Sequence, residues 1–345
     1  MDITAEILNK PFGLAIPTDE EMEKYYRGER LQAFQLGWPS VKLGLLPGNL
    51  TLISGYGNQG KGTFIRQVSL QMFVRYQIRS VYWAPEDSPA EYFYGDLIHT
   101  WTGKSTEKHH SNYIPENEYK IAFKEVTDMV KLIDFGDEVP TVIQILEVFT
   151  HYYTRFGCRM IVIDPFNNTS DMNASDRDDK VVRSVCLAAK LWLKSHQDCF
   201  VVIVLHPKAP SGVKSGEDPK CPTYNDLHYG SDWSKFGDDI FMWHHPSFNS
   251  NPENNDRILS PAKIKKQKIS GRKVNYNMIW KFEENRILDS DWQCGLPPIK
   301  TAPVKAEPKQ TDLLDQRQPD ASGANPGGMK PHKGLEPIGK DDLPF

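Results

Sequence analysis

The segment GYGNQGKGT, residues 55–63, constrains the fold of this chain more than any other. It follows the apolar run LTLIS at 50–54, which is typical of a buried strand. It precedes residues 63–77, TFIRQVSLQMFVRYQ, whose apolar side chains recur at helical spacing. The sequence therefore predicts a strand, a glycine-rich loop and a helix in direct succession.

This loop has the residues that phosphate binding requires. Backbone N–H groups must converge on phosphate oxygens, glycines must let the backbone come close, and a lysine must reach the β and γ phosphates. Strand and helix flank the loop as a Walker A motif requires, although a tight turn without a ligand remains the alternative. The predicted nucleotide-binding residues are Gly55, Gly57, Asn58, Gln59, Gly60, Lys61, Gly62 and Thr63.

The loop departs from the common pattern at one position. A serine or threonine usually follows the lysine, and its hydroxyl ligates Mg²⁺. Here Gly62 follows, and Thr63 comes one residue later. The order G-K-G-T also resembles the phosphate loop of adenylate kinases, which function with glycine at this position. We therefore expect Thr63, together with Asp164, to hold Mg²⁺ through water.

Strand and helix patterns alternate through the middle of the chain. Such alternation predicts an α/β fold with a mostly parallel central sheet and helices on both faces, and ligands at the carboxyl ends of the strands. Residues 273–282 alternate like a strand near the sheet edge. The further predicted strands are 79–85, 131–136, 159–166, 200–207 and 239–245, and the further helices are 89–101, 141–156, with Thr141 as N-cap, and 178–196.

Three polar residues follow predicted strands. Asp164 ends the apolar run MIVI and fits the Walker B role of orienting the water shell of the metal. Glu86, in WAPED, is the candidate base for hydrolysis and lies beside the phosphate loop if its strand neighbours the first strand. His206 is placed to sense a γ phosphate. The alternatives are a surface carboxylate for Glu86 and a structural role for His206.

Composition divides the chain and limits its function. We expect an N-terminal extension at 1–40, an ATPase core at 41–290 and a disordered Pro- and Gly-rich tail at 296–345 ending in DDLPF, a candidate docking peptide. The net charge of −4 excludes a global basic field, leaving a local basic patch at 263–273. Five scattered cysteines suggest a reducing cytoplasm, and no apolar run approaches the roughly 18 residues of a membrane helix.

Several motifs together resemble one family. GWPS, LPGNLTLISGYGNQGKGTF, WAPED, MIVIDPFN, VLHPK and YGSDWSKFGDDIFMWHH follow the order seen in RecA-type helicase domains, and most nearly in the Twinkle-like and DnaB-like replicative helicases. The resemblance covers about residues 37–285. It implies a ring-forming, often hexameric ATPase that moves on single-stranded DNA and binds ATP between subunits, here in DNA replication of a phage or mobile element.

The resemblance also assigns roles by position. It implies that Lys61 binds phosphate, that Glu86 and Asp164 are the catalytic and Walker B acids, and that His206 is the γ-phosphate sensor. The stretch 207–227 corresponds to the mobile channel loop, where Lys208 and Lys214 are available for DNA phosphates. The candidates for the finger that reaches into the ATP of the next subunit are Lys266, Lys268 and Arg272.

Other features leave alternatives open. Lysine lacks the planar fork of an arginine finger, and the helical collar and primase domain of many relatives are missing. The DDLPF tip resembles that of bacterial single-stranded-DNA-binding proteins, which recruits replication and repair partners. A RecA-like recombination or helicase-loader ATPase, and a non-hydrolysing nucleotide-binding interaction protein, remain alternatives. A nucleotide kinase ranks last because no substrate-lid pattern is present.

Overall fold

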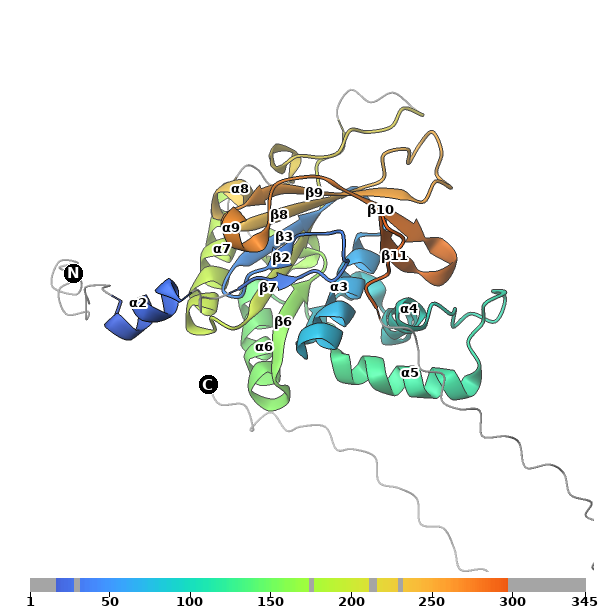
Figure 1. The fold of residues 1–345 in the computed structure, drawn as a ribbon, viewed down its shortest axis with the longest axis horizontal. Helices are drawn as coiled ribbons and strands as arrows, with labels where there is room; N and C mark the ends of the chain where they lie inside the picture. Colours follow the sequence, from blue (N-terminus) through green and yellow to red (C-terminus); the bar gives the residue numbers. More distant parts are fainter. Residues whose placement is uncertain (1–16, 28–31, 174–176, 211–215, 229–231, 297–345) are drawn as a thin grey trace, which may run out of the picture. The chain divides into compact units, whose positions relative to one another are not determined.

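A nine-stranded sheet forms the centre of the fold (Figure 1), in the order β11-β10-β9-β8-β3-β7-β6-β4-β5. The six strands from β8 to β5 run parallel to one another, whereas β9, β10 and β11 are antiparallel. The strands are β3 (Leu50–Ser54), β4 (Arg79–Trp83), β5 (Val130–Leu132), β6 (Cys158–Ile163), β7 (Phe200–Leu205), β8 (Asp239–His244), β9 (Asp256–Ile264), β10 (Tyr276–Lys281) and β11 (Arg286–Asp289). Phe34–Gln35 and Gly44–Leu45 form a separate pair, β1 and β2.

This computed structural model describes residues 17–27, 32–173, 177–210, 216–228 and 232–296. They lie within a unit that spans Met1–Lys300, and the second unit, Thr301–Phe345, falls outside the described residues together with the DDLPF tip. Among the described residues, no helix has the length and apolarity needed to cross a membrane. The helices are α2 (Asp19–Tyr26), α3 (Lys61–Tyr76), α4 (Ala90–Thr102), α5 (Glu116–Met129), α6 (Val142–Phe156), α7 (Asp178–Ser195), α8 (Asp232–Phe236) and α9 (Gln267–Ser270).

Helices cover both faces of the sheet because successive strand residues point in opposite directions. In β3, Ile53 packs into the cluster that contains α3, α4 and α5, whereas Leu52 packs into the cluster that contains α6, α7 and α8. The other central strands alternate in the same way, with Val202 and Val201 of β7 on opposite faces. These strands read as continuous apolar runs because both of their faces are buried.

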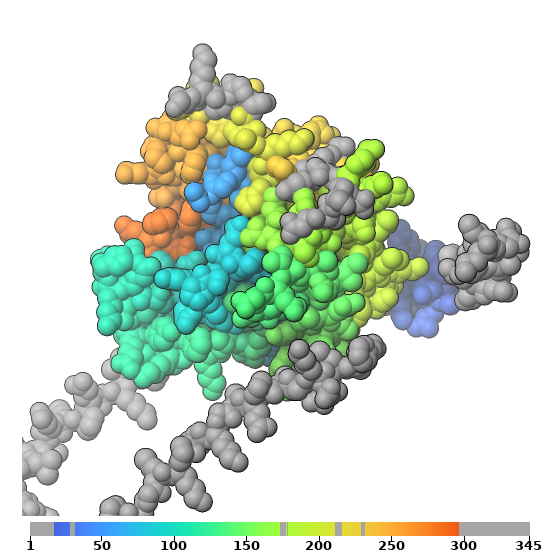
Figure 2. Space-filling model, turned by 180° about the vertical axis from the view of Figure 1, so that it is seen from behind, coloured from blue at the N-terminus to red at the C-terminus, as the bar shows by residue number. Residues whose placement is uncertain are grey.

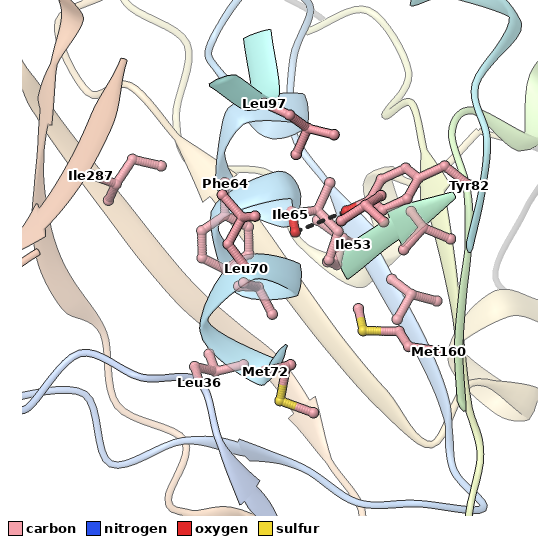
Figure 3. Packing of buried hydrophobic residues seen from close by; sticks show 14 of the residues in the cluster. Leu36, Ile53, Phe64, Ile65, Leu70, Met72, Tyr82, Leu97, Met160 and Ile287 are labelled. Atoms are coloured by element: carbon pink, nitrogen blue, oxygen red, sulfur yellow. Dashed lines mark hydrogen bonds between the residues drawn. The ribbon is translucent and has the colours of Figure 1, made fainter. Parts of the chain in front are cut away.

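Helix α3 carries the phosphate loop and is itself deeply buried. Figure 3 shows Phe64, Ile65 and Leu70 of α3 within the apolar cluster. The Tyr82 hydroxyl of β4 donates a hydrogen bond to the Ile65 carbonyl at 3.0 Å. Burial of this kind fixes the first turn of α3, and therefore fixes the loop before it.

The sequence-based predictions of fold class and of most elements are confirmed. Thr141 caps α6 as predicted, since its hydroxyl accepts from the Gln144 N–H. The strand predicted at 131–136 was too long, because the chain leaves the sheet after Leu132. Helix α5 and the strands β9 and β11 were missed, and the predicted strand near the edge is β10, next to β11.

Residues just ahead of position 41 contribute to the core. Leu36 and Trp38 are buried, and the Trp38 ring stacks on Phe64 of α3 with 5.7 Å between centroids. The Trp38 indole N–H also donates to the Ile287 carbonyl of β11 at 2.8 Å. The segment before the first central strand therefore joins α3 to the sheet edge.

Candidate active site

A cavity of about 240 Å³ opens at the carboxyl ends of β3, β7, β6 and β4, which are neighbours in the sheet. Figure 2 shows the blue stretch that includes the phosphate loop reaching the surface between the orange β9–β10 region and yellow to green segments. Ligands of open α/β sheets bind at this edge. The residues that line the cavity are Gly57, Asn58, Gly60, Lys61, Gly62, Thr63, Arg66, Glu86, Asp87, Asp164 and His206.

The cavity brings together the predicted phosphate loop and the three predicted catalytic residues. Helix α3 starts after Gly60, which has φ of 87°, and no side chain caps its first N–H groups. Uncapped N–H groups at a helix N-terminus are donors for an anion. The buried Lys61 ammonium donates to the Tyr56 carbonyl at 2.8 Å. Burial lowers the pKa of Lys61, and the charges of Asp164 and Glu86 oppose this shift.

Two predicted loop residues, Gly55 and Gln59, lie behind the cavity and not on its surface. Gly55 is pressed against the Trp243 carbonyl, 2.1 Å from where a Cβ would stand. Gln59 is fully buried, and its carbonyl accepts the Trp243 indole N–H at 2.7 Å and the Arg257 Nε–H at 3.3 Å. Its side-chain oxygen accepts the backbone N–H of His245 at 3.0 Å.

We call this support of the loop the rear wall: Trp243, His245, Arg257 and Trp280, from β8 to β10, packed against Gln59 and Gly60. A Cβ on Gly60 would lie 2.8 Å from the Trp280 ring. The Arg257 guanidinium lies over that ring, 5.0 Å from its centroid. The antiparallel strands therefore hold the phosphate loop from behind.

Asp164 follows β6 and faces the cavity, as the Walker B prediction requires. Its backbone N–H donates to the Trp83 carbonyl at 3.0 Å, which continues the pairing of β6 with β4. Burial raises the pKa of the Asp164 carboxyl to about 6, and this rise persists although the nearby Arg66 and Lys61 charges favour the ionised form. A carboxylate here would gain from a cation bound in the cavity.

Glu86 reaches the cavity by a route that the sequence did not predict. Strand β4 does not neighbour β3, because β7 and β6 lie between them. Instead, the 3₁₀ turn Pro85–Asp87 after β4 brings Glu86 to the cavity. Its Oε1 accepts a hydrogen bond from the Asn168 side chain at 3.2 Å, and the carboxylate is otherwise exposed. The condition on strand order was wrong, yet Glu86 lies in the cavity.

His206 follows β7 and is half-buried at the cavity edge. Burial lowers its pKa, the positive charge of Lys61 adds to the effect, and Glu86 opposes it. Its carbonyl accepts the His228 N–H at 3.1 Å, next to a bridge between Pro207 and Leu227. The imidazole is therefore held near the cavity in its neutral form, able to donate or accept one hydrogen bond.

The Thr63 side chain is buried and bonded to a distant strand. Its hydroxyl donates to the Asn285 side-chain oxygen at 3.2 Å, just before β11. The hydroxyl proton is therefore directed toward Asn285. The role of Thr63 at the metal stays a prediction.

Two further residues line the cavity and were not predicted. The Arg66 guanidinium is buried, and it donates to Asp87 Oδ2 at 2.8 Å and to Asp96 Oδ2 at 2.9 Å. A Cβ on Gly62 would lie only 3.2 Å from Arg66 Nη2. The available signal was the spacing, because residues four apart on a helix face each other and Gly62 leaves room for a large neighbour. We call Lys61, Glu86, Asp87, Asp164 and His206 the front wall.

The predicted DNA and finger residues lie away from the cavity. Lys208 has an exposed side chain after β7, and Lys214 lies outside the described residues. Lys266, Lys268 and Arg272 are exposed around α9, in the connection from β9 to β10. Their roles toward DNA and a neighbouring subunit stay predictions.

Solved structures that are similar to this chain include two from helicases of one type. An ATPase domain aligns with a TM-score of 0.65 and 15% identity, covering 79% of this chain and 98% of that domain. A DnaB-like replicative helicase, solved to study its interactions with primase, aligns with a TM-score of 0.64 and 14% identity, covering 83% of this chain and 70% of that one. The fold is that of a DnaB-like helicase ATPase domain.

This DnaB-like fold is reached by a sequence that has diverged far. No protein-family model matches it, and no curated protein sequence does either. Within the fold, the front wall and the phosphate loop of this chain meet at the end of the sheet where such sheets bind ligands.

Proposed function

We propose that this chain is an ATP-dependent DNA helicase or translocase that acts on single-stranded DNA in replication, in a bacterial or phage-infected cytoplasm. One observation carries the proposal: four strand ends bring Lys61, Glu86, Asp164 and His206 into one cavity with a glycine-rich loop. The likeness to DnaB-like ATPase domains, one of them from a replicative helicase, supports the same activity.

The chemistry is phosphoryl transfer to water. Lys61 and the first N–H groups of α3 would hold the β and γ phosphates, because they point a positive charge and free donors at the cavity. Glu86 would orient the attacking water and take its proton, since it is exposed at the cavity edge. His206 would contact the γ phosphate and lose that contact after hydrolysis.

The cavity also suits Mg²⁺, a hard cation that takes oxygen ligands and keeps several water molecules. Carboxylates of Glu86, Asp87 and Asp164 line it, and hydroxyl and carbonyl oxygens lie at the loop. When bound, Mg²⁺ supplies neutralisation of the phosphate charge. Asp164 would hold water molecules of the metal shell, and its negative charge is favoured once a cation is near.

Assembly and DNA binding complete the proposal. ATP would lie between subunits of a ring, with Lys266, Lys268 or Arg272 of one subunit reaching the nucleotide of the next. Their exposure at the β9–β10 connection supports this arrangement. Lys208 and Lys214 would contact DNA phosphates, which needs no base recognition. The DDLPF tip would recruit a replication or repair partner.

ATP hydrolysis with and without single-stranded DNA tests the proposal. We expect DNA to stimulate the wild-type rate, and Lys61→Ala to lower the rate by a factor on the order of 10² or more, because the phosphates lose their main cationic contact. The matched control is Lys124→Ala, an exposed lysine of helix α5, which should leave the rate unchanged. A rate that is indifferent to DNA and to Lys61→Ala would refute the proposal.

Two alternatives have defined signatures. A RecA-like recombination or loader ATPase would form filaments or remodel partners and would fail to unwind a forked DNA. Electron microscopy with ATP and DNA separates rings from filaments. A non-hydrolysing interaction protein would bind nucleotide and release no phosphate, and the departure at Gly62 is the feature that keeps this alternative in view.

A further inference from the structure

We propose that Asp87, held in place by Arg66, takes over the metal-orienting task of the hydroxyl that is missing at Gly62. The inference rests on the proposed function and names a further residue of the same site. It concerns binding of the metal–nucleotide pair, so it can be tested without measuring turnover.

The first step of the argument is the space beside the loop. A side chain at Gly62 would meet the Arg66 guanidinium, since a Cβ there would lie 3.2 to 3.4 Å from its Nη2, Nη1 and Cζ atoms. That distance is tighter than ordinary van der Waals contact. Gly62 and Arg66 therefore belong together, because the glycine makes room for a guanidinium next to the position of the usual hydroxyl.

The second step is what the guanidinium holds. Arg66 is buried and cannot lose its proton, so its charge must be compensated. It binds Asp87 and Asp96, on η1 and α4, through separate nitrogen atoms. Of these two carboxylates, only Asp87 lines the cavity.

The third step is the chemistry of Asp87. Its ion pair with Arg66 uses Oδ2, and the side chain is 31% exposed. A carboxylate has a second oxygen with which it can accept a hydrogen bond from water. Asp164 faces the same cavity, and the two charges are close enough that Asp87 raises the pKa of Asp164. Two carboxylates near the phosphates suit the water shell of Mg²⁺.

The fourth step concerns the contact through water. Among the described residues, the only three potential ligands that lie within 4.8 Å of one another are Glu107, His109 and His110, on an exposed loop elsewhere. Glu86, Asp87 and Asp164 are therefore too far apart for all three to bind one ion directly. Asp87 would act on water molecules that the ion carries.

Nucleotide affinity, with Mg²⁺ and with EDTA, tests the inference. A fluorescent ATP analogue is titrated into wild-type protein and into Asp87→Asn, and we expect the Mg²⁺-dependent gain in affinity to fall about tenfold in the variant, as loss of a charge-assisted hydrogen bond implies. Affinity in EDTA should be unchanged, because Asp87 does not contact the phosphates. Electron paramagnetic resonance of Mn²⁺, bound together with the analogue, should show a matching loss of metal affinity.

Asp96→Asn is the matched control. It removes the same charge from the same guanidinium, but Asp96 does not line the cavity. We expect it to keep the full Mg²⁺-dependent gain, and melting curves of both variants check that they fold. A full gain in Asp87→Asn, or an equal loss in both variants, would overturn the inference. A wild-type protein that binds no nucleotide in either buffer would instead refute the proposed function.

Discussion

The phosphate loop is held between two walls of different chemistry. The rear wall is buried and is built of aromatic rings and backbone hydrogen bonds, with Trp243 and Trp280 against Gln59 and Gly60. The front wall carries one ammonium, three carboxylates and an imidazole around a cavity. The rear wall comes from β8, β9 and β10, and the front wall from the ends of β3, β4, β6 and β7.

This difference separates stability from chemistry. Tight packing makes the rear wall sensitive to any change in volume. Charges at the cavity pay a desolvation cost that a bound nucleotide and metal would offset. Substitutions behind the loop should therefore unfold the protein, whereas substitutions in front of it should change binding and turnover.

The largest expected effect lies in the rear wall. Gly60→Ala adds a Cβ 2.8 Å from the Trp280 ring, at a residue with φ of 87°. Overpacking and left-handed strain together should lower the free energy of unfolding by about 2–5 kcal/mol. Chemical denaturation measures the loss. The matched control is Gly157→Ala, with φ of 65° and open space around the added Cβ, which should lose only the strain contribution. Equal losses would show that the rear wall is not tightly packed.

The two walls should also respond to pH in opposite directions. His244, beside the rear wall, is buried, and its pKa is lowered to about 4. Between pH 6.5 and 4 the unfolded chain then binds more protons at this site, so stability falls as the pH falls, by up to about 3 kcal/mol. Asp164 has a folded pKa of about 6, above its unfolded value. Between pH 6 and 4 the folded chain binds more protons there, so stability rises as the pH falls.

Single substitutions unmask each contribution. Asp164→Asn should make stability fall more steeply between pH 6 and 4, and His244→Asn should make it fall less steeply or rise. Unfolding free energies measured across this range give both slopes. If Asp164→Asn left the slope unchanged, the front wall would not carry the desolvation cost that its burial implies.

The smallest expected effect is at Thr63, which lies between the walls. Thr63→Val removes the hydrogen bond to Asn285 and should cost about 1 kcal/mol of stability. The exposed Thr127→Val in α5 is the control, and it should cost less, since its hydroxyl bonds only within its own helix. The gain in nucleotide affinity from Mg²⁺ should survive in Thr63→Val. Loss of that gain would return the metal to Thr63, as the sequence suggested.

The sequence predicted the front wall well and the rear wall poorly, for a physical reason. Lys61, Glu86, Asp164 and His206 each follow an apolar run, so their common place at the sheet edge follows from parallel topology. The rear wall depends on β9, whose sequence DRILSPAKI mixes proline and charges into the strand and hides its period. Gln59 lies in the loop by sequence, but its burial depends on strands that arrive some 180 residues later.

Arg66 and Asp87 show the same limit within the cavity itself. Each reads as an ordinary surface charge in its own segment, and only the tertiary fold brings β4 to α3. Strand order was likewise out of reach, because local patterns do not state which strands are neighbours. Motif spacing therefore located the site, and packing decided which charges complete it.

The most direct test of the central claim is Glu86→Gln, with nucleotide binding and phosphate release measured on the same sample. The variant keeps the size of the side chain and removes the base, while the phosphate loop and rear wall stay intact. We predict wild-type nucleotide affinity and a turnover lower by a factor on the order of 10²–10⁴, the usual contribution of a general base. Wild-type turnover in Glu86→Gln would contradict the assignment of this cavity as the hydrolytic site.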